Sequence, residues 1–377
     1  MAREAAITHL TRRGLIVGAS AALTLAALPA MAKRSVMPPA RPVRANGINL
    51  SVHDVGTGPA VILLHGFPSL AFGWRHQVAP LVEAGYRVIV PDLRGYGLSD
   101  APTAIEAYSI DRLTGDVVGI MDALGVKSAA IAGHDWGGLL AWQLPLLHPA
   151  RVAAVIGVNT PYIPDWMLWL HPDVVRAALL EGRTFVADPR RPPIAQMRQV
   201  YSPDMYVLMF QDSLKADRAM GRSPRDTIRS TYRKGLLPAL QWGDLPKDAA
   251  NMEVYGKPIP ATLPGKDVLT PAEVDVYARA FERTGFTPAI NWYRNLDRNW
   301  AASRDLDPRI DAPALMVSGR DDFVLRPSMA DGMSAYVSKL TRHVIEGCGH
   351  WTPEEKPDQL NRLMLGWLAT VDRSRFA

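Results

Sequence analysis

The chain has 377 residues, of which 48% are hydrophobic and 21% charged, the proportions of an ordinary globular protein. They exclude a disordered or collagen-like chain, and the length suits one domain with a large insertion, or two domains. The 42 basic and 37 acidic residues give a net charge of +5, but no five like charges follow one another, so no nucleic-acid partner is expected. The single cysteine, Cys348, excludes an intramolecular disulfide and a cysteine-rich metal site.

The N-terminal segment has the layout of an export signal. Arg12 and Arg13 precede an apolar run over residues 15–28, and Ala32 completes a small-residue pattern that suits cleavage. Because the run is shorter than the roughly 20 apolar residues that span a bilayer, we expect a cleaved signal and no stable membrane anchor. Paired arginines resemble the twin-arginine signal, which implies a periplasmic or secreted protein that is exported in its folded state. Removing residues 1–32 takes away three basic residues and one acidic residue and leaves a net charge of about +3.

The remainder of the chain alternates short apolar runs, typical of strands, with helical stretches. This alternation predicts a mostly parallel sheet with helices on both faces. The first run ends in a Gly-Thr-Gly sequence and is predicted to form a hairpin with the second. The strand-like runs are Ile48–Val55, Val61–Leu64, Arg87–Val90, Ala129–Ala132, Val152–Val158 and Ala314–Val317, and the main helical stretches are Ile110–Leu124, Gly138–His148 and Pro357–Val371.

One interruption of this alternation is too long to be a connection. About 150 residues rich in proline and aromatic side chains separate the last two strand-like runs, and a crossover needs far fewer. We therefore predict an inserted, mainly helical cap. The predicted organisation is a signal over residues 1–32, a linker over 33–45, a first core part over 46–159, the cap over 160–310 and a second core part over 311–377.

Residues 133–138 read Gly-His-Asp-Trp-Gly-Gly and lie between a predicted strand and a predicted helix. The Gly-x-Asp-x-Gly spacing is that of a nucleophile elbow with aspartate where serine usually stands. The glycines permit a sharp turn that lifts Asp135 above the sheet, and the positive end of the following helix favours the ionised, nucleophilic carboxylate. An aspartate that only caps the helix is the alternative, so this motif alone leaves both interpretations open.

Three further strand ends carry polar groups that suit a catalytic site. A His-Gly-Phe-Pro sequence over residues 65–68 places the backbone N–H of Phe67 where an oxyanion hole takes its second donor; a plain strand-to-helix turn is the alternative. Asp322 follows a later strand, and His350 lies in a glycine-rich turn near the end of the chain. The order Asp135, Asp322, His350 is a nucleophile, acid, base order, which favours a catalytic role for the histidine.

With these motifs the chain resembles the epoxide hydrolases of the α/β-hydrolase fold, over residues 45–370. The resemblance implies two cap tyrosines near the nucleophile. Tyr293 lies in an Asn-Trp-Tyr-Arg-Asn motif, and Tyr206 lies in a looser match for which Tyr201 and Tyr232 are alternatives. The motifs that carry the resemblance are His65–Pro68, Asp92–Asp100, Gly133–Gly138, Asn291–Asn295, Asp322–Leu325 and Gly349–Trp351.

The resemblance implies hydrolysis of a small apolar epoxide by water to a vicinal diol. Carboxylate attack by Asp135 would form an ester while Tyr206 and Tyr293 donate to the departing oxygen. His350, oriented by Asp322, would then activate the water that cleaves the ester. This chemistry needs no metal and no organic cofactor.

The same resemblance assigns the surroundings of the nucleophile. The backbone N–H groups of Phe67 and Trp136 are expected to form the oxyanion hole. The side chains of Phe67, Trp136 and Trp292 are expected to contact the substrate. His65, His134 and Asp92 are expected to hold turns by hydrogen bonds, and Cys348 to be a small packing residue.

Two other functions use the same residues. A haloalkane or haloacid dehalogenase shares the aspartate and histidine, but its halide needs N–H donors; Phe67 has no side-chain donor, and Trp136 stands where a fluoroacetate-type enzyme would carry arginine. A non-catalytic ligand-binding protein on the same fold is the alternative from another class. The Asn291–Asn295 motif favours the epoxide interpretation.

Overall fold

The computed structural model describes residues 37–178, 184–203, 205–211, 214–235 and 265–377. The export signal predicted over residues 1–32 lies outside these residues. Within them, no helix combines the length and the apolar character that crossing a membrane requires. The linker predicted over 33–45 is wrong in its second half, because Ala40–Ala45 form a strand that pairs with the next one along the chain.

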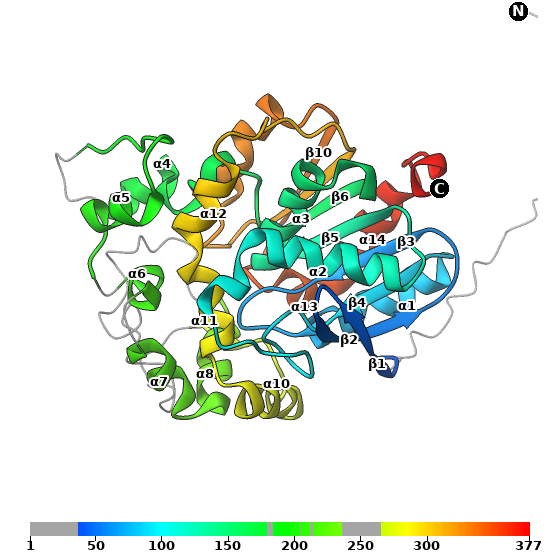
Figure 1. Ribbon diagram of the computed structural model, residues 1–377, viewed down its shortest axis with the longest axis horizontal. Helices are drawn as coiled ribbons and strands as arrows, with labels where there is room; N and C mark the ends of the chain where they lie inside the picture. Colours follow the sequence, from blue (N-terminus) through cyan, green and yellow to red (C-terminus); the bar gives the residue numbers. More distant parts are fainter. Residues whose placement is uncertain (1–36, 179–183, 204, 212–213, 236–264) are drawn as a thin grey trace, which may run out of the picture. The chain divides into compact units, whose positions relative to one another are not determined.

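Eight strands form one sheet in the order β1-β2-β4-β3-β5-β6-β9-β10 (Figure 1). Only β1 with β2 and β2 with β4 pair antiparallel, so the predicted mostly parallel sheet is confirmed. The predicted hairpin of the first two apolar runs is wrong, because β2 pairs with β4 and not with β3. The strands are β1 (Ala40–Ala45), β2 (Ile48–Val55), β3 (Ala60–Leu64), β4 (Arg87–Pro91), β5 (Ala129–His134), β6 (Val152–Val158), β9 (Ala314–Gly319) and β10 (Leu340–Ile345).

Helices cover both faces of this sheet. On one face α3 (Trp136–Leu147) packs on β5 and β6 and against α2 (Ile110–Ala123); on the other, α1 (Arg75–Glu83) packs on β4 and against α14 (Pro357–Leu368). Alternate residues of each central strand enter two separate buried clusters, so both strand faces are apolar. This explains why the central strands read as continuous apolar runs in the sequence.

The described part of the insertion between β6 and β9 is mainly helical, as predicted (Figure 1). Two short strands, β7 (Arg233–Lys234) and β8 (Lys266–Asp267), pair antiparallel within it. Its helices are α4 (Pro172–Ala178), α5 (Pro193–Val200), α6 (Tyr206–Gln211), α7 (Lys215–Gly221), α8 (Pro224–Thr231), α10 (Pro271–Thr284), α11 (Thr287–Arg294) and α12 (Leu296–Ser303).

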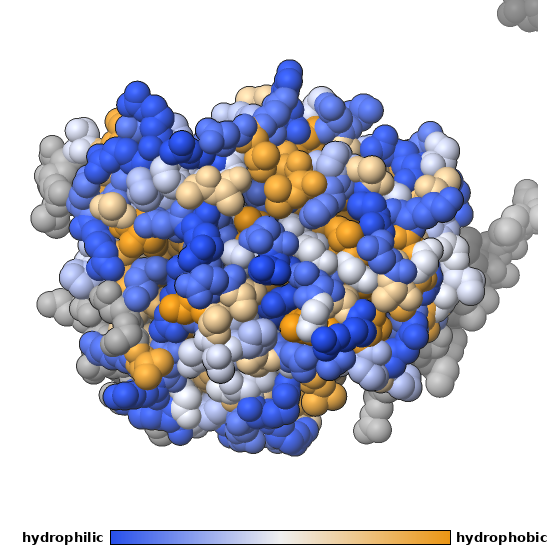
Figure 2. Space-filling model, in the orientation of Figure 1, coloured by the Kyte–Doolittle hydropathy of each residue, from blue (hydrophilic) through white to orange (hydrophobic). Residues whose placement is uncertain are grey.

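Most large apolar side chains lie in the two buried clusters, and the outer surface is mixed. The face in Figure 2 shows hydrophilic residues interspersed with small apolar groups. In the described part of the chain, the large apolar side chains that are exposed are Leu98, Ile105, Val186, Leu214 and Val344, which are far apart in the sequence. Scattered exposed apolar residues of this kind are normal on a protein surface.

A buried ionic cluster joins the cap to the core. The guanidinium of Arg75 on α1 lies 2.6 Å from Glu273 of cap helix α10 and 2.5 Å from Glu354 of the core helix α13 (Thr352–Glu355). The hydroxyl of Tyr277, also on α10, donates to Glu354 at 2.7 Å. Burial alone would lower the pKa of Arg75, but its carboxylate partners raise it above the ordinary value, so the arginine stays charged.

Breaking this buried ionic cluster should lower the free energy of unfolding. In Arg75→Met the buried Glu354 loses its counter-charge, so the free energy of unfolding falls by about 3–5 kcal/mol. Arg320→Met is the matched control, because Arg320 also pairs with a glutamate, Glu346, but on the exposed surface, where ion pairs contribute little. Urea unfolding of the three proteins measures both effects. Equal losses in the two variants would contradict a structural role for the buried cluster.

Candidate active site

The turn between β5 and α3 has the backbone strain of a nucleophile elbow. Asp135 adopts φ 53° and ψ −122°, a conformation that non-glycine residues rarely occupy. A Cβ on Gly137 would overlap the carbonyl oxygens of Leu64 and His65, so only glycine lets the turn approach the end of β3. Strand β3 pairs with β5 with Leu64 opposite Gly133, and this register brings the two strand ends together.

The carboxylate of Asp135 lies in the predicted oxyanion hole. The backbone N–H of Phe67 donates to Asp135 Oδ1 at 2.6 Å, and the backbone N–H of Trp136 also hydrogen-bonds this carboxylate. Burial raises the pKa of Asp135 above its ordinary value, and His350 together with the two N–H groups opposes that rise. These N–H groups therefore already bind the carboxylate of the predicted nucleophile, and Oδ2 is the oxygen turned toward His350.

The structure brings the three predicted triad residues together. His350 Nε2 lies 3.8 Å from Asp135 Oδ2, and His350 Nδ1 lies 2.9 Å from Asp322 Oδ2. Asp322 Oδ1 accepts the backbone N–H groups of Val324 and Leu325, both at 2.9 Å. His350 is thus hydrogen-bonded to Asp322 and lies within ion-pair distance of Asp135, and Asp322 is held by its own loop.

Asn159 is a residue of this site that the sequence did not reveal. It follows β6, has a φ of 62°, and donates from Nδ2 to Asp322 Oδ2 at 2.8 Å and to the carbonyl of Gly349 at 3.2 Å. It therefore fixes both the acid and the loop that carries the base. The sequence does place this polar residue at the end of β6, next to the strand that leads into Asp135, and this position was the one hint of a role in the site.

Charges around His350 favour its protonated form. Burial alone would lower the pKa of His350, but Asp322 and Asp135 raise it to about 9. Burial would likewise raise the pKa of Asp322, yet His350, the N–H of Leu325 and the amide of Asn159 lower it below its ordinary value. Asp322 therefore stays ionised and holds the Nδ1 proton of the histidine.

The two cap tyrosines meet above the elbow. Tyr206 begins α6 and Tyr293 lies on α11, and their rings pack edge to face with centroids 5.9 Å apart. Tyr293 also packs against Trp136 at 4.9 Å and Phe67 at 5.3 Å, the residues on either side of the Asp135 carboxylate. Burial and the charge of Asp135 raise the pKa of Tyr293 well above its ordinary value, so it remains a neutral O–H donor.

The alternatives to Tyr206 have other partners. Tyr201 donates its hydroxyl to the backbone carbonyl of Trp169 at 2.5 Å. The ring of Tyr232 stacks on that of Trp351, with centroids 3.7 Å apart. Of the three candidates, only Tyr206 packs against Tyr293 among the ring contacts of the described residues. The geometry therefore favours Tyr206 as the second tyrosine.

Reciprocal hydrogen bonds tie the two tyrosine helices together. Gln211 of α6 donates to the carbonyl of Tyr293 at 3.0 Å, and Arg294 of α11 donates to the carbonyl of Phe210 at 2.8 Å. Arg294 also forms a buried ion pair with Asp217 at 2.7 Å. Glutamine, arginine and aspartate are common on helices, so the sequence alone did not indicate that these residues connect α6 and α11.

Of the three side chains predicted to contact the substrate, two lie beside Asp135 and the third packs against one of them. Phe67 and Trp136 flank the Asp135 carboxylate and pack on Tyr293. Trp292 donates its indole N–H to the carbonyl of Arg94 at 3.2 Å and packs edge-on against Trp136. Its contacts are those of a residue that supports Trp136, and substrate contact by Trp292 stays a prediction.

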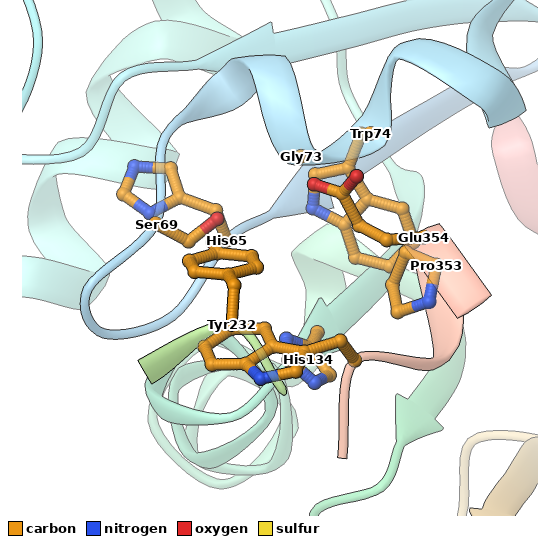
Figure 3. Close-up of a pocket in the computed structure, with 9 residues that line it drawn as sticks. His65, Ser69, Gly73, Trp74, His134, Tyr232, Pro353 and Glu354 are labelled. Atoms are coloured by element: carbon orange, nitrogen blue, oxygen red, sulfur yellow. The ribbon is translucent and has the colours of Figure 1, made fainter. Parts of the chain in front are cut away.

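A small polar cavity of about 10 Å³, room for one water molecule, lies behind the elbow (Figure 3). Two of its lining residues, His65 and His134, are predicted to hold turns. His65 accepts the N–H of Leu93 at 3.0 Å, and His134 Nε2 lies 2.7 Å from the carbonyl of His350. These hydrogen bonds agree with the predicted structural role, and burial lowers the pKa of His65 to about 4 and that of His134 to about 3.

Two other predicted structural residues also behave as expected. Asp92 accepts the backbone N–H groups of Ala71 and Leu98. Cys348 is fully buried beside Thr352, and burial raises the pKa of its thiol to about 12, which excludes a thiolate nucleophile at neutral pH. In the described ranges, no three histidine, cysteine or acidic side chains come together as metal ligands.

Comparison with known proteins agrees with this geometry. Residues 59–357 match the alpha/beta hydrolase fold family. Epoxide hydrolase A of Mycobacterium tuberculosis is 39% identical over 347 residues, which cover 89% of this chain and 98% of that protein. Bifunctional epoxide hydrolase 2 of Mus musculus is 35% identical over 86% of this chain, which spans 54% of the mouse protein. The crystal structure of epoxide hydrolase A from Mycobacterium thermoresistibile superposes with a TM-score of 0.74 at 38% identity, covering 89% of this chain and 99% of that one.

The charge balance at the histidine can be measured directly. In Asp322→Asn the largest source of negative charge at His350 is removed, so the pKa of His350 falls below about 9. Asp321→Asn removes a neighbouring charge that does not contact His350 and should leave its titration unchanged. NMR titration of the histidine ring measures both. An unchanged His350 titration in Asp322→Asn would rule out the proposed charge coupling.

Proposed function

The chain is an epoxide hydrolase of the α/β-hydrolase fold family, and on that premise we propose that it opens a small apolar epoxide through a covalent ester on Asp135 and releases a vicinal diol. The observation that carries this proposal is the pairing of Tyr206 and Tyr293 over an aspartate elbow. Neutral phenols suit an epoxide because its oxygen leaves as an alkoxide and needs a proton.

In the first step Asp135 Oδ2 attacks a ring carbon. The new bond joins Oδ2 to that carbon, the ring C–O bond breaks, and a phenol of Tyr206 or Tyr293 gives its proton to the departing oxygen. Oδ1 stays with the N–H of Phe67 and becomes the carbonyl oxygen of the ester, and the N–H of Trp136 also hydrogen-bonds this carboxylate. Attack at a saturated carbon gives an ester that water can cleave, whereas attack on a carboxylic ester would give an anhydride.

In the second step water cleaves that ester. His350 Nε2 takes a proton from the water while its oxygen attacks the carbonyl carbon of Asp135. Negative charge develops on Oδ1, where each backbone donor typically contributes about 3 kcal/mol of stabilisation. The bond between the carbonyl carbon and Oδ2 breaks, and Oδ2 leaves as a hydroxyl of the diol with the proton that His350 took from water. The new carboxylic acid gives its proton back to the phenolate, so the enzyme is regenerated with the water oxygen in Asp135.

Formation of the ester prepares His350 for its role. Asp135 contributes negative charge that helps to raise the pKa of His350 to about 9 in the free enzyme. The ester is neutral, so this contribution is lost and the pKa falls. After the nucleophile has reacted, a larger fraction of His350 is therefore neutral at a given pH and able to accept a proton from water.

Removing the base should trap the intermediate. In His350→Gln, ester formation continues but its hydrolysis stops, so the intact mass increases by the mass of one epoxide and no second turnover occurs. Peptide mapping should place the added mass on Asp135. His343→Gln, an exposed histidine on β10, is the control and should turn over without an adduct. Absence of an adduct, or an adduct on another residue, would refute the proposal.

The hydrolysis step should depend on pH through His350. The histidine accepts a proton only when neutral, so ester hydrolysis slows about tenfold per pH unit below its pKa in the ester and is constant above it. Because the ester removes the charge of Asp135, the pH range in which the rate of ester hydrolysis rises with pH lies below pH 9. Stopped-flow measurement of ester decay between pH 5 and 10 tests this. A hydrolysis rate that still rises with pH at or above pH 9 would contradict the proposed loss of charge at Asp135.

A further inference from the structure

The phenol oxygen of Tyr206 is bound by a tryptophan that the reaction scheme does not include. The indole Nε1–H of Trp169 donates to Tyr206 Oη at 3.0 Å. An indole N–H donates hydrogen bonds and cannot accept them. Tyr206 Oη is therefore the acceptor in this contact, and the proton of the phenol must be directed to a different acceptor.

The position of Trp169 is fixed on several sides. It lies in the short 3₁₀ helix η5 (Leu168–Leu170) with 7% of its surface exposed. Tyr201 donates to its backbone carbonyl, and its ring packs 6.1 Å from Trp136 and 6.2 Å from Tyr293. These contacts hold the indole between the elbow and the tyrosine pair, so its N–H keeps a constant direction toward Tyr206.

We propose that Trp169 is a positioning residue that aims the Tyr206 proton at the epoxide oxygen and stabilises the negative charge left on Tyr206. This inference rests on the proposed acid role of Tyr206. As that proton is transferred, charge develops on the phenol oxygen, and a hydrogen bond to a charged oxygen is stronger than one to a neutral oxygen. The indole contact therefore strengthens most in the transition state, which is the condition for accelerating ester formation.

Trp169→Phe removes the N–H and keeps an aromatic ring. Ester formation in single turnovers should slow by about 10- to 100-fold, the loss of one hydrogen bond to a charged group. Hydrolysis of the ester should keep its rate, since it uses His350 and the oxyanion hole. Replacing Trp169 with benzothienylalanine, in which sulfur replaces the N–H, gives the same test with less change in packing.

Trp166→Phe is the matched control. Trp166 is also a buried cap tryptophan, packs 6.2 Å from Trp136, and donates its indole N–H to a hydroxyl, that of Ser303, at 2.7 Å. It differs in having no hydrogen bond to a tyrosine among those of the described residues. Its substitution should leave ester formation near the wild-type rate. Equal losses in the two variants, or equal slowing of both chemical steps in Trp169→Phe, would overturn the inference.

A series of substrates can show whether Trp169→Phe weakens proton donation by Tyr206 or only disturbs the packing around it. Among ring-substituted aryl epoxides, the defect of Trp169→Phe should grow as the leaving alkoxide becomes more basic, because such an oxygen depends more on the proton donor. A packing defect would slow all members of the series alike. A defect independent of the substituent would therefore also overturn the inference.

A double-mutant cycle distinguishes this inference from the function on which it rests. If Trp169 acts through Tyr206, then Trp169→Phe has no further effect in a Tyr206→Phe background. If Tyr206→Phe itself leaves ester formation unchanged, the acid role of Tyr206 fails and the inference fails with it. If Tyr206→Phe slows ester formation and Trp169→Phe does not, the inference alone is wrong.

Discussion

The hydrogen bond from the Phe67 N–H to Asp135 Oδ1, 2.6 Å long, is the constraint on which the rest of the site depends. It requires β3 and β5 to be neighbours and to end at the same level, which their parallel register provides. It also requires Asp135 to adopt a positive φ and Gly137 to lie against the end of β3 without a Cβ. With Oδ1 held in this way, Oδ2 is the oxygen that meets both the histidine and an incoming carbon.

Electrostatic interactions between His350 and two carboxylates are the second feature that organises the site. His350 lies between two carboxylates, and their combined charge keeps it protonated before the reaction. In the proposed mechanism one carboxylate becomes an ester, while the other still holds Nδ1 and Nε2 becomes available to water. The same three side chains would then serve both steps, because the reaction changes their charge. The cap supplies what the core lacks, neutral O–H donors, from α6 and α11.

The sequence predicted the fold class and the site residues that lie in local motifs, but it missed strand β1 and gave β2 the wrong partner. The elbow, the acid, the base and Tyr293 each follow a strand or lie in a short pattern, so their neighbours in sequence indicate their role. The remaining features depend on contacts between distant segments. Asn159 and Asp322 are 163 positions apart, and nothing near Asn159 indicates that it binds an acid. Trp169 is one of ten tryptophans, and only its contact with Tyr206 distinguishes it.

In the proposed mechanism Asp135 becomes covalently bound to the substrate, and the resulting ester is hydrolysed at the aspartate carbonyl carbon. A single turnover with enzyme in excess in ¹⁸O-water measures this directly, because the ester route takes the first diol oxygen from the aspartate and not from the solvent. The ester mechanism predicts that ¹⁸O appears first in the carboxylate of Asp135, read by mass spectrometry of its peptide, while the first diol is unlabelled. Label in the first diol, with none in Asp135, would contradict it.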